Sequence, residues 1–504
     1  MNILFVTADQ WRGECLSALG HSVVKTPHLD SLAAEGTLFR QHYAQATPCA
    51  PSRTSMHTGM YMSNHRCVNN GTPVDGRLNN WALEMRAAGY DPSLFGYTDT
   101  APDPRGMDEN DPRLTHYSEP LPGIGSFTPY RNEVSVGWVE SLLARGYTIP
   151  DTLTNLYADT VEGSEWEDGG DVPLPLAIKA EDHETYFMVD ECIDWIAAQH
   201  ESWVTHLSLL RPHGPYAAPE PYNRLYDPST LAIPTRADAV EQEARQHPLL
   251  DYSLQQEKFK APESDRVIQR KMASYFGLMT EVDDNLGRLF EYLKTSGQWD
   301  STLIIFCSDH GEQMGDHWLM GKVGYFDQSY YIPLIIRDPR PAADPGRGKQ
   351  FDAFTENVDL MPTMLDWLEL DIPAQCDGQS LLPMMHTGEV PESWRSEVHW
   401  EFDFRKLYQV PTDGAFDFGA HQSSLSVIRD RHYKYVHFTA LPPLLFDLQQ
   451  DPGETVNLAD NPEYQSILLE YVHKMLSWRM KHTDRALTEI SLTEQGPVTI
   501  RSPL

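Results

Sequence analysis

The sequence predicts an α/β protein in which a large, mostly parallel sheet lies between helices, with a smaller α+β part after it. Short apolar runs such as residues 3–8 and 302–307 show no polar alternation, which is typical of strands buried on both faces. Segments with helical periodicity separate such runs up to about residue 385. Four of the runs are followed directly by polar clusters, as expected where a parallel sheet binds ligands at its carboxyl edge.

The main sheet is predicted from apolar runs that turn residues bound. In chain order these strands are residues 3–8, 92–97, 203–210, 302–307 and 331–336. The helices are predicted from three-four spacing of apolar residues and from glycine at helix ends. They cover residues 27–36, 55–62, 81–88, 184–198 and 271–293. Residues 101–182 and 215–262 show little periodicity, so we expect long, irregular loops there.

The last quarter of the chain has a different pattern. Its short strand candidates are separated by turn residues and followed by one closing helix. The strands are residues 397–402, 424–429, 433–438 and 444–447, and the helix is residues 464–479. We therefore expect a catalytic α/β domain over residues 1–390 and a C-terminal α+β subdomain with a small antiparallel sheet over residues 391–504.

Composition excludes several classes of protein. The formal net charge of -34 argues against nucleic acid as a partner, since a basic face is needed to bind phosphates. No stretch is apolar enough to span a membrane. The six cysteines are scattered without a CxxC pair, which indicates reduced thiols, and the first residues show no signal-peptide pattern. We expect a cytoplasmic protein without a membrane or nucleic-acid partner.

Four polar clusters share one position, immediately after a predicted strand. They are Asp9-Gln10, Tyr97-Thr98-Asp99, Arg211-Pro212-His213 and Asp309-His310. A single aspartate at such a place is usually a helix cap. Because the carboxyl ends of parallel strands lie side by side, the four clusters can converge instead. Carboxylates with an imidazole suit calcium, magnesium or manganese.

A further unusual stretch is Thr47-Pro48-Cys49-Ala50-Pro51-Ser52-Arg53, followed by Thr58-Gly59. One interpretation is a buried, inert thiol in a turn. The other is a reactive residue in a loop that the prolines stiffen and that Arg53 makes positive. The heptapeptide alone favours neither interpretation.

The motifs together resemble the type I sulfatases. Cys49-Ala50-Pro51-Ser52-Arg53 with Thr58-Gly59 matches their C-x-P-S-R signature. Asp9 and Ser308-Asp309-His310-Gly311 match their metal-binding strand ends. Leu445-Phe446-Asp447-Leu448, with Asp451-Pro452-Gly453-Glu454 and Asn457-Leu458, is similar to their C-terminal signature, so the resemblance covers the whole chain.

Within that family the chain is most similar to the phosphonate monoester hydrolases and related arylsulfatases. The segments that carry this likeness are Asn64-His65-Arg66, Asn70, Gly96-Tyr97-Thr98, Pro102-Asp103-Pro104-Arg105 and Arg211-Pro212-His213. Most sulfatases have a G-K-x-H element where this chain has Gly96-Tyr97-Thr98-Asp99. The phosphonate hydrolases usually have threonine at the position of Asp99, and Gln10 replaces an aspartate that most sulfatases carry.

The resemblance implies a fold and a cofactor set. The fold would be the alkaline phosphatase-like sandwich. Cys49 would be oxidised to formylglycine, whose hydrated aldehyde supplies the oxygen that attacks sulfur or phosphorus. One divalent metal ion, Ca²⁺ or Mn²⁺, would be held by Asp9, Gln10, Cys49, Asp309 and His310. The product acid would leave by C–O cleavage, so sulfate monoesters, phosphonate monoesters and phosphodiesters could share one site.

The resemblance also assigns roles to individual residues. The catalytic set is Cys49, Arg53, Asn70, Tyr97, His213 and Lys322. The substrate-binding set is Asn70, Tyr97, Thr98, Asp99, His213 and Lys322. Among these, Lys322 follows Asp309 by 13 residues and stands next to Gly321.

The sequence therefore predicts a hydrolase of sulfate monoesters. One alternative is a phosphonate monoester hydrolase or phosphodiesterase that uses the same site. An alternative of another class is an inactive binding relative with an unmodified Cys49. The expected partners are a small anionic ester, a formylglycine-generating enzyme during maturation, and further copies of the chain in a homodimer or homotetramer.

Overall fold

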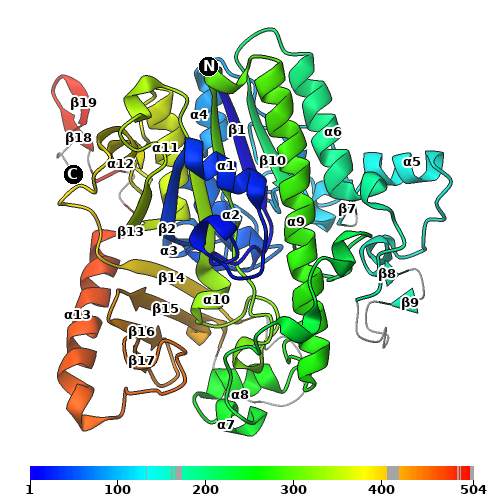
Figure 1. The fold of residues 1–504 in the computed structure, drawn as a ribbon. Coiled ribbons are helices and arrows are strands. Elements are labelled where there is room, and N and C mark those ends of the chain that lie inside the picture. The colour runs from blue at the N-terminus through cyan, green and yellow to red at the C-terminus, as the bar shows by residue number, and fades with distance from the viewer. Residues whose placement is uncertain are drawn as a thin grey trace.

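A mixed sheet of eight strands runs through the centre of the protein (Figure 1). The structure is a computed structural model that describes residues 1–131, 133–160, 163–164, 173–405, 419–484, 487–488 and 490–499. The strand order is β13-β2-β12-β11-β1-β10-β4-β5, and only the two pairs made by β12 are antiparallel. The strands are β1 (Asn2–Ala8), β2 (Thr37–Tyr43), β4 (Ser93–Gly96), β5 (Gly125–Ser126), β10 (Val204–Leu209), β11 (Thr302–Cys307), β12 (Tyr331–Arg337) and β13 (Gln350–Glu356).

Helices cover both faces of this sheet, which explains why its central strands are buried and mostly apolar. Along β1, Leu4 and Val6 pack into one core cluster and Ile3 and Phe5 into another. The first cluster includes residues of α1 (Pro27–Glu35), α6 (Glu184–Ala197) and α9 (Asp265–Thr295). The second includes residues of α2 (Cys49–Thr58), α4 (Trp81–Ala87), α11 (Leu360–Trp367) and α12 (Leu382–Thr387). The predicted α/β architecture with a mostly parallel sheet is confirmed.

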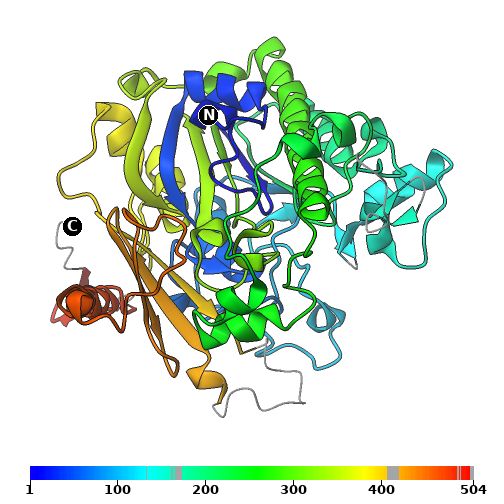
Figure 2. The same ribbon diagram turned by 60° about the horizontal axis from the view of Figure 1, so that its bottom comes forward.

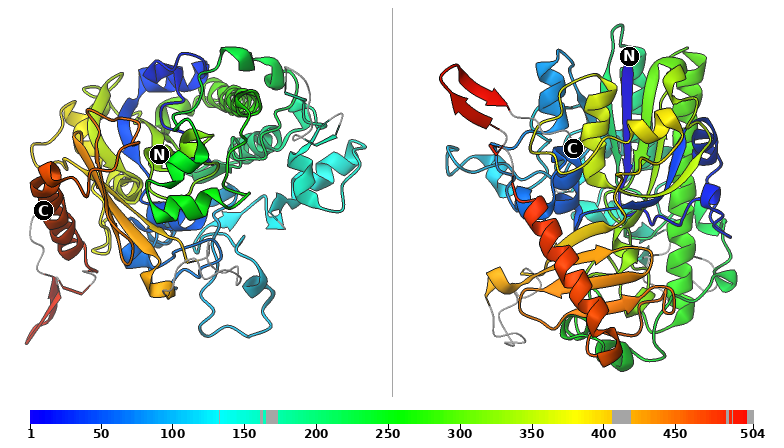
Figure 3. Two further views of the ribbon diagram at one scale, coloured as in Figure 1. Left: turned by 90° about the horizontal axis from the view of Figure 1, so that it is seen from below. Right: turned by 90° about the vertical axis from the view of Figure 1, so that its left-hand side faces the viewer.

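A second sheet lies beside the first, with α13 (Gln465–Lys481) packed against it (Figures 2 and 3). Its order is β17-β16-β15-β14-β3. These strands are β3 (Ala46–Thr47), β14 (Val398–Asp403), β15 (Ser424–Arg429), β16 (Tyr433–Phe438) and β17 (Leu444–Asp447). Strand β3 pairs with β14 and ends two residues before Cys49, so the C-terminal sheet supports the segment that carries this cysteine. The expected boundary at residues 390 and 391 falls between α12 and β14 and stays a prediction.

The helix expected from Ser55 begins six residues earlier, at Cys49. Proline usually argues against a helix. Pro51 is tolerated here because it lies in the first turn, where a backbone N–H has no carbonyl partner within the helix. The helix also ends at Thr58, and a separate turn, α3 (Met62–His65), follows. Consequently Cys49 is the first residue of a helix.

The expected long loops contain more structure than their composition indicated. The first holds α5 (Val136–Ala144), the hairpin of β6 (Tyr130–Arg131) and β7 (Val134–Ser135), and the hairpin of β8 (Asp159–Thr160) and β9 (Gly163–Ser164). The second holds α7 (Val240–Ala244) and α8 (Pro248–Leu254). Part of the first loop, residues 161–162 and 165–172, lies outside the described residues.

The remaining elements are short. They are α10 (Asp327–Tyr330) and a C-terminal hairpin of β18 (Ile490–Thr493) and β19 (Gly496–Thr499). In the part of the chain that the structure describes, no helix has the length and apolar character needed to cross a lipid bilayer.

Candidate active site

The four polar clusters do converge, because they follow neighbouring parallel strands. Strand β1 pairs with both β10 and β11, and β10 pairs with β4. Asp9, Asp99, His213 and Asp309 follow these four strands, and all come close to Cys49 at the start of α2. The candidate site therefore lies at the carboxyl edge of the sheet, as the sequence predicted.

Cys49 is almost fully buried at the centre of the site, with 5% of its surface exposed. Its Sγ lies 3.2 Å from Nε2 of His310 and 3.2 Å from Nζ of Lys322. Burial, with the negative charge of Asp9 nearby, raises the pKa of the Cys49 thiol well above its usual value. Despite the adjacent lysine, Cys49 is therefore poorly suited to act as a thiolate nucleophile.

Arg53 lies one helical turn after Cys49 and is completely buried. Its Nε donates to Oδ2 of Asp309 at 2.9 Å, and its Nη2 donates to Oδ2 of Asp9 at 3.0 Å. Its Nη1 donates to the Tyr97 carbonyl at 3.0 Å and to Oγ of Ser208 at 2.7 Å. The guanidinium thus ties the ends of β1, β4, β10 and β11 together and fixes both carboxylates.

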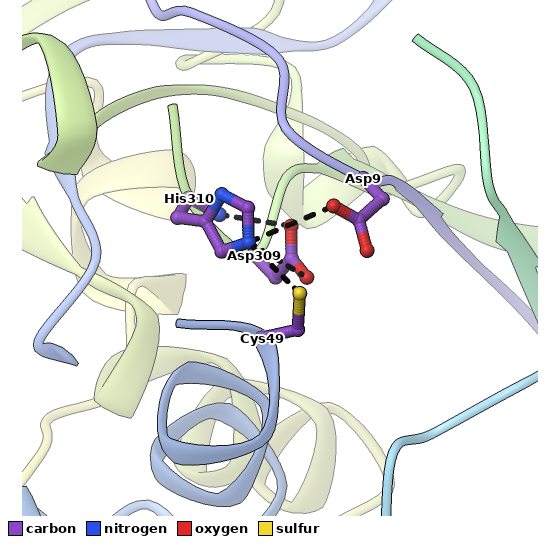
Figure 4. Close-up of side chains that lie close together, drawn as sticks. All are labelled: Asp9, Cys49, Asp309 and His310. Carbon is purple, nitrogen blue, oxygen red and sulfur yellow. Dashed lines mark hydrogen bonds and ion pairs between the residues drawn. The ribbon is translucent and has the colours of Figure 1, made fainter. Parts of the chain in front are cut away.

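Ligand atoms of Asp9, Cys49, Asp309 and His310 all lie within 4.8 Å of one another (Figure 4). Nδ1 of His310 lies 3.0 Å from the Gly311 carbonyl, which can only accept, so Nδ1 carries the proton. Nε2 therefore turns a lone pair towards carboxylate oxygens of Asp9 and Asp309, each 3.6 Å away. Burial lowers the pKa of His310 to about 3, which keeps this ring neutral.

This cluster of acceptors fits a divalent cation. Oδ1 of Asp9 is buried and has no hydrogen-bond partner among the described residues. Burial and the negative charge of Asp9 raise the pKa of Asp309 to about 6. A cation bound between the two carboxylates and the imidazole lone pair would satisfy all three groups, and oxygen-rich sets of this kind favour hard metal ions.

Gln10 and Lys322 close one side of the cluster. Nζ of Lys322 donates to Oε1 of Gln10 at 2.7 Å, and Nε2 of Gln10 donates to Glu312 and, at 2.8 Å, to the hydroxyl of Tyr216. The amide oxygen of Gln10 is thus engaged by Lys322 in this structure. Its expected role as a metal ligand stays a prediction.

Asn70 and Tyr97 lie on the other side. Oδ1 of Asn70 accepts from the Ala50 backbone N–H at 2.9 Å, and the Tyr97 hydroxyl donates to Oδ2 of Asp9 at 2.5 Å. Thr98 is buried and bonds to the loop that follows it, with its Oγ1 donating to the Glu119 carbonyl at 3.2 Å and accepting from the Leu121 N–H at 2.9 Å. Asn70 and Tyr97 line the cavity at Cys49, whereas the Thr98 hydroxyl forms hydrogen bonds with the loop that follows it.

Asp99 and His213 line the same cavity. Asp99 has a positive φ of 50°, which aspartate tolerates, and its Oδ2 lies 3.6 Å from Nε of Arg53. Burial raises the pKa of Asp99 to about 7, although Arg53 opposes this shift. Nδ1 of His213 bonds to the Gly214 carbonyl at 2.6 Å, and burial lowers the pKa of His213 to about 4.

Several residues at the site were not among the sequence candidates. Ser208, near the end of β10, bonds to Arg53, and Glu312, three residues after Asp309, bonds to Gln10. Ser208 lies near the end of a predicted strand and Glu312 lies shortly after the Asp309-His310 cluster, so their positions could have identified them. Tyr117 lines the cavity from a loop, and Tyr130 and Glu133 line it from the β6–β7 hairpin. These segments carry no motif, so their sequence gave no signal.

Comparison with known proteins now defines the class. The family described as Sulfatase matches residues 1–370, and the family described as N-sulphoglucosamine sulphohydrolase, C-terminal, matches residues 315–481. The chain belongs to the sulfatase family, a branch of the alkaline phosphatase-like hydrolases. Members of this family generally use a formylglycine and a divalent metal ion to hydrolyse an anionic ester.

Three similar proteins point to one part of this family. The chain is 43% identical to the phosphonate monoester hydrolase of Agrobacterium radiobacter, with a TM-score of 0.93 and full coverage of both chains. It is 38% identical to the phosphonate monoester hydrolase of Silicibacter pomeroyi, with a TM-score of 0.89 and 99% coverage of both. It is 40% identical, over 99% of both chains, to the multifunctional alkaline phosphatase superfamily protein PehA of Trinickia caryophylli. These matches confirm the predicted family and branch.

Proposed function

We propose that the chain hydrolyses phosphonate monoesters and sulfate monoesters in one site, with phosphonate monoesters as the better substrates. The observation that carries this proposal is the placing of Cys49 within 3.2 Å of both Lys322 and His310, beside two carboxylates. Similarity over the whole chain to two phosphonate monoester hydrolases supports the order of preference. A phosphodiester is also a monoanionic tetrahedral ester, so we include it as a third substrate class.

The cofactors of the family fit the residues present. In this structure the Cys49 sulfur stands where an oxygen of formylglycine would lie. Asp9, Asp309 and His310 would hold the metal ion together with that oxygen, and Gln10 would be a weaker, neutral ligand. With formylglycine and Ca²⁺ or Mn²⁺ in place, the site would supply an oxygen nucleophile of lowered pKa and positive charge for the substrate oxygens.

Arg53 and Lys322 have different roles in this proposal. Arg53 does not line the cavity at Cys49. Its nitrogen atoms bond instead to Asp9, Asp309, Ser208 and the Tyr97 carbonyl. It therefore acts as a positioning residue that holds the two carboxylates. Lys322 reaches the nucleophile position directly, and the negative groups around it raise its pKa, so it offers a permanent cation to the ester oxygens.

His213 is the proposed proton donor to the leaving oxygen. The Gly214 carbonyl holds the proton on Nδ1, so a second proton must reside on Nε2 for donation. A bound anionic ester beside the ring favours that cationic form. The proton then passes from Nε2 to the leaving oxygen as its bond to phosphorus or sulfur breaks.

The burial of the segment around Cys49 bears on when this cysteine can be modified. Cys49, Pro51, Ser52 and Arg53 are all buried, so a formylglycine-generating enzyme would have to act before the chain folds around them. We propose that the mature protein is a homodimer or homotetramer. The six cysteines are buried and form no disulfide, which supports a reducing, cytoplasmic setting.

A substrate panel tests the proposed order of preference. We expect kcat/KM for p-nitrophenyl methylphosphonate to exceed that for p-nitrophenyl sulfate by at least about tenfold, with a p-nitrophenyl phosphodiester also hydrolysed. All three compounds share one leaving group, so differences in kcat/KM reflect the sulfate, phosphonate or phosphodiester group. Activity confined to the sulfate would overturn the proposed preference.

Asp99 predicts a pH dependence with a definite sign. Its pKa of about 7 means that it is neutral below this pH and negative above it, beside an anionic substrate. We expect kcat/KM to fall roughly tenfold from pH 6 to pH 8, as for one group that must be protonated. Asp99→Asn keeps the size without the charge and should flatten the profile in this range. A variant that retains the full wild-type slope would exclude Asp99 as the titrating group.

A further inference from the structure

Two cavities meet at the active site, and they differ in size and lining. The narrow pocket has a volume of about 110 Å³ and is lined by residues that include Cys49, Asp99, Tyr117, Tyr130, Leu210 and His213. The open cleft has a volume of about 990 Å³ and is lined by residues that include Gln10, His213, Tyr216, Ala261, Met320 and Lys322. Among the described residues, only His213 lines both cavities, so the reacting centre lies beside this ring, between the two cavities.

Sulfate monoesters and phosphonate monoesters carry different numbers of organic groups, so they need different space in such a site. A sulfate monoester has one organic group, the alcohol that leaves. A phosphonate monoester has two, because its hydrolysis breaks the P–O bond to the alcohol, adds the elements of water and keeps the P–C bond. A site for phosphonate monoesters therefore needs separate space for the leaving alcohol and for the group that stays on phosphorus.

The positions of Lys322 and His213 assign the cavities. Both can stabilise the leaving oxygen, and both line the open cleft. Cys49 lines the narrow pocket and not the cleft, so an in-line attack directs the leaving oxygen away from Cys49, towards the cleft, and leaves the narrow pocket for the group that stays on phosphorus. The cleft is large enough for a bulky alcohol, whereas the narrow pocket is smaller than the roughly 150 Å³ cavity that accommodates benzene in an engineered protein.

The narrow pocket is also acidic. Asp99 and Glu133 both line it, and the Tyr117 hydroxyl donates to Oε1 of Glu133 at 3.0 Å. Tyr97 and Tyr130 form its aromatic wall, with ring centroids 5.1 Å apart. An aliphatic substituent suits these rings, while a second negative charge on the substituent would be repelled by the two acids.

We propose that the narrow pocket selects the phosphorus substituent and the open cleft accepts the leaving alcohol, so that the preferred substrates are esters of small, non-acidic alkylphosphonic acids with larger alcohols. This inference rests on the proposed phosphonate monoesterase activity and adds the shape of the substrate to it. It also gives Tyr117 a role as a specificity-determining residue.

Three p-nitrophenyl esters test the pocket, those of methyl-, phenyl- and carboxymethylphosphonic acid. We expect the methyl ester to have the highest kcat/KM. Tyr117→Ala should raise the phenyl-to-methyl ratio of kcat/KM at least about tenfold, because the shortened side chain opens the pocket. Tyr186→Ala is a matched control, since the Tyr186 ring packs on Arg288 away from both cavities.

A variant of the cleft completes the test. Met320→Trp should lower kcat/KM for a 4-methylumbelliferyl ester relative to a methyl ester of the same phosphonic acid, while the phenyl-to-methyl ratio for the retained group stays as in the wild type. The reverse pattern, in which Tyr117→Ala changes only alcohol preference, would overturn the assignment. A wild-type enzyme that cleaves sulfate but none of the phosphonates would instead refute the proposed function on which the inference rests.

Discussion

Cys49→Ala should abolish the hydrolysis of sulfate, phosphonate and phosphodiester substrates together, lowering kcat/KM on the order of 10⁵-fold. Loss of this size is typical when the nucleophile of an enzyme is removed. Cys49 lies in contact with His310 and Lys322, at the point where the proposed metal ligands converge. Steady-state kinetics with the three p-nitrophenyl substrates measures the effect.

The matched control is Cys67→Ala, which removes a buried cysteine that forms no disulfide and lines neither cavity of the site. It should retain the wild-type ratios among the three substrates. If Cys49→Ala lost one activity and kept another, a nucleophile shared by all three reactions would be refuted. Serine at position 49 is not an equivalent replacement, because it lacks the second oxygen that expels the product acid.

Asp309→Asn should lower both the tightly bound metal and kcat/KM, the latter by at least about 100-fold. Even the outer partners of metal ligands cause losses of that order when they are changed. The asparagine can still accept from the N–H groups of Gln10 and His310 at Oδ1, but its NH₂ group replaces the oxygen that accepts from Arg53. The change therefore removes a negative ligand and places donor against donor.

Metal content by inductively coupled plasma mass spectrometry, measured after dialysis, separates this effect from misfolding. The control is Asp284→Asn, because Asp284 belongs to the other His/Asp group of suitable geometry, formed with His28 and Asp283. That group is partly exposed, and its variant should keep the wild-type metal content. Unchanged metal in a folded Asp309→Asn variant would contradict the assigned site.

Much of the fold follows from local sequence patterns. Strands such as β1 and β11 are buried at every position and mostly apolar, because helices cover both faces of the sheet, and this leaves a clear signal in the sequence. Strand β2 was not predicted, since Arg40 and Gln41 interrupt its buried residues near the edge of the sheet. Helix α11 was missed as well. Its interior proline, Pro362, obscured a buried helical segment.

Several site residues could be predicted in addition to the fold class, because they lie at the ends of strands. The positions of Asp9, Asp309 and His310 followed from parallel strand order, whereas the modification of Cys49 came only from the family resemblance. The network of Arg53 was not predictable, since it depends on the Tyr97 carbonyl and on Ser208 of a distant strand. Tyr117 reaches the narrow pocket from an irregular loop and Glu133 from the turn of the short β6–β7 hairpin, and no periodicity encodes the path of either segment.

The central claim is that Cys49 is the precursor of the nucleophile. It is tested most directly by the mass of the peptide that contains Cys49, in protein produced with a formylglycine-generating enzyme. We predict a peptide about 18 daltons lighter than its cysteine form, as oxidation of the thiol to the aldehyde requires. The specific activity of different preparations should rise in proportion to the converted fraction. Full activity in protein whose Cys49 peptide shows the unmodified mass would contradict the account.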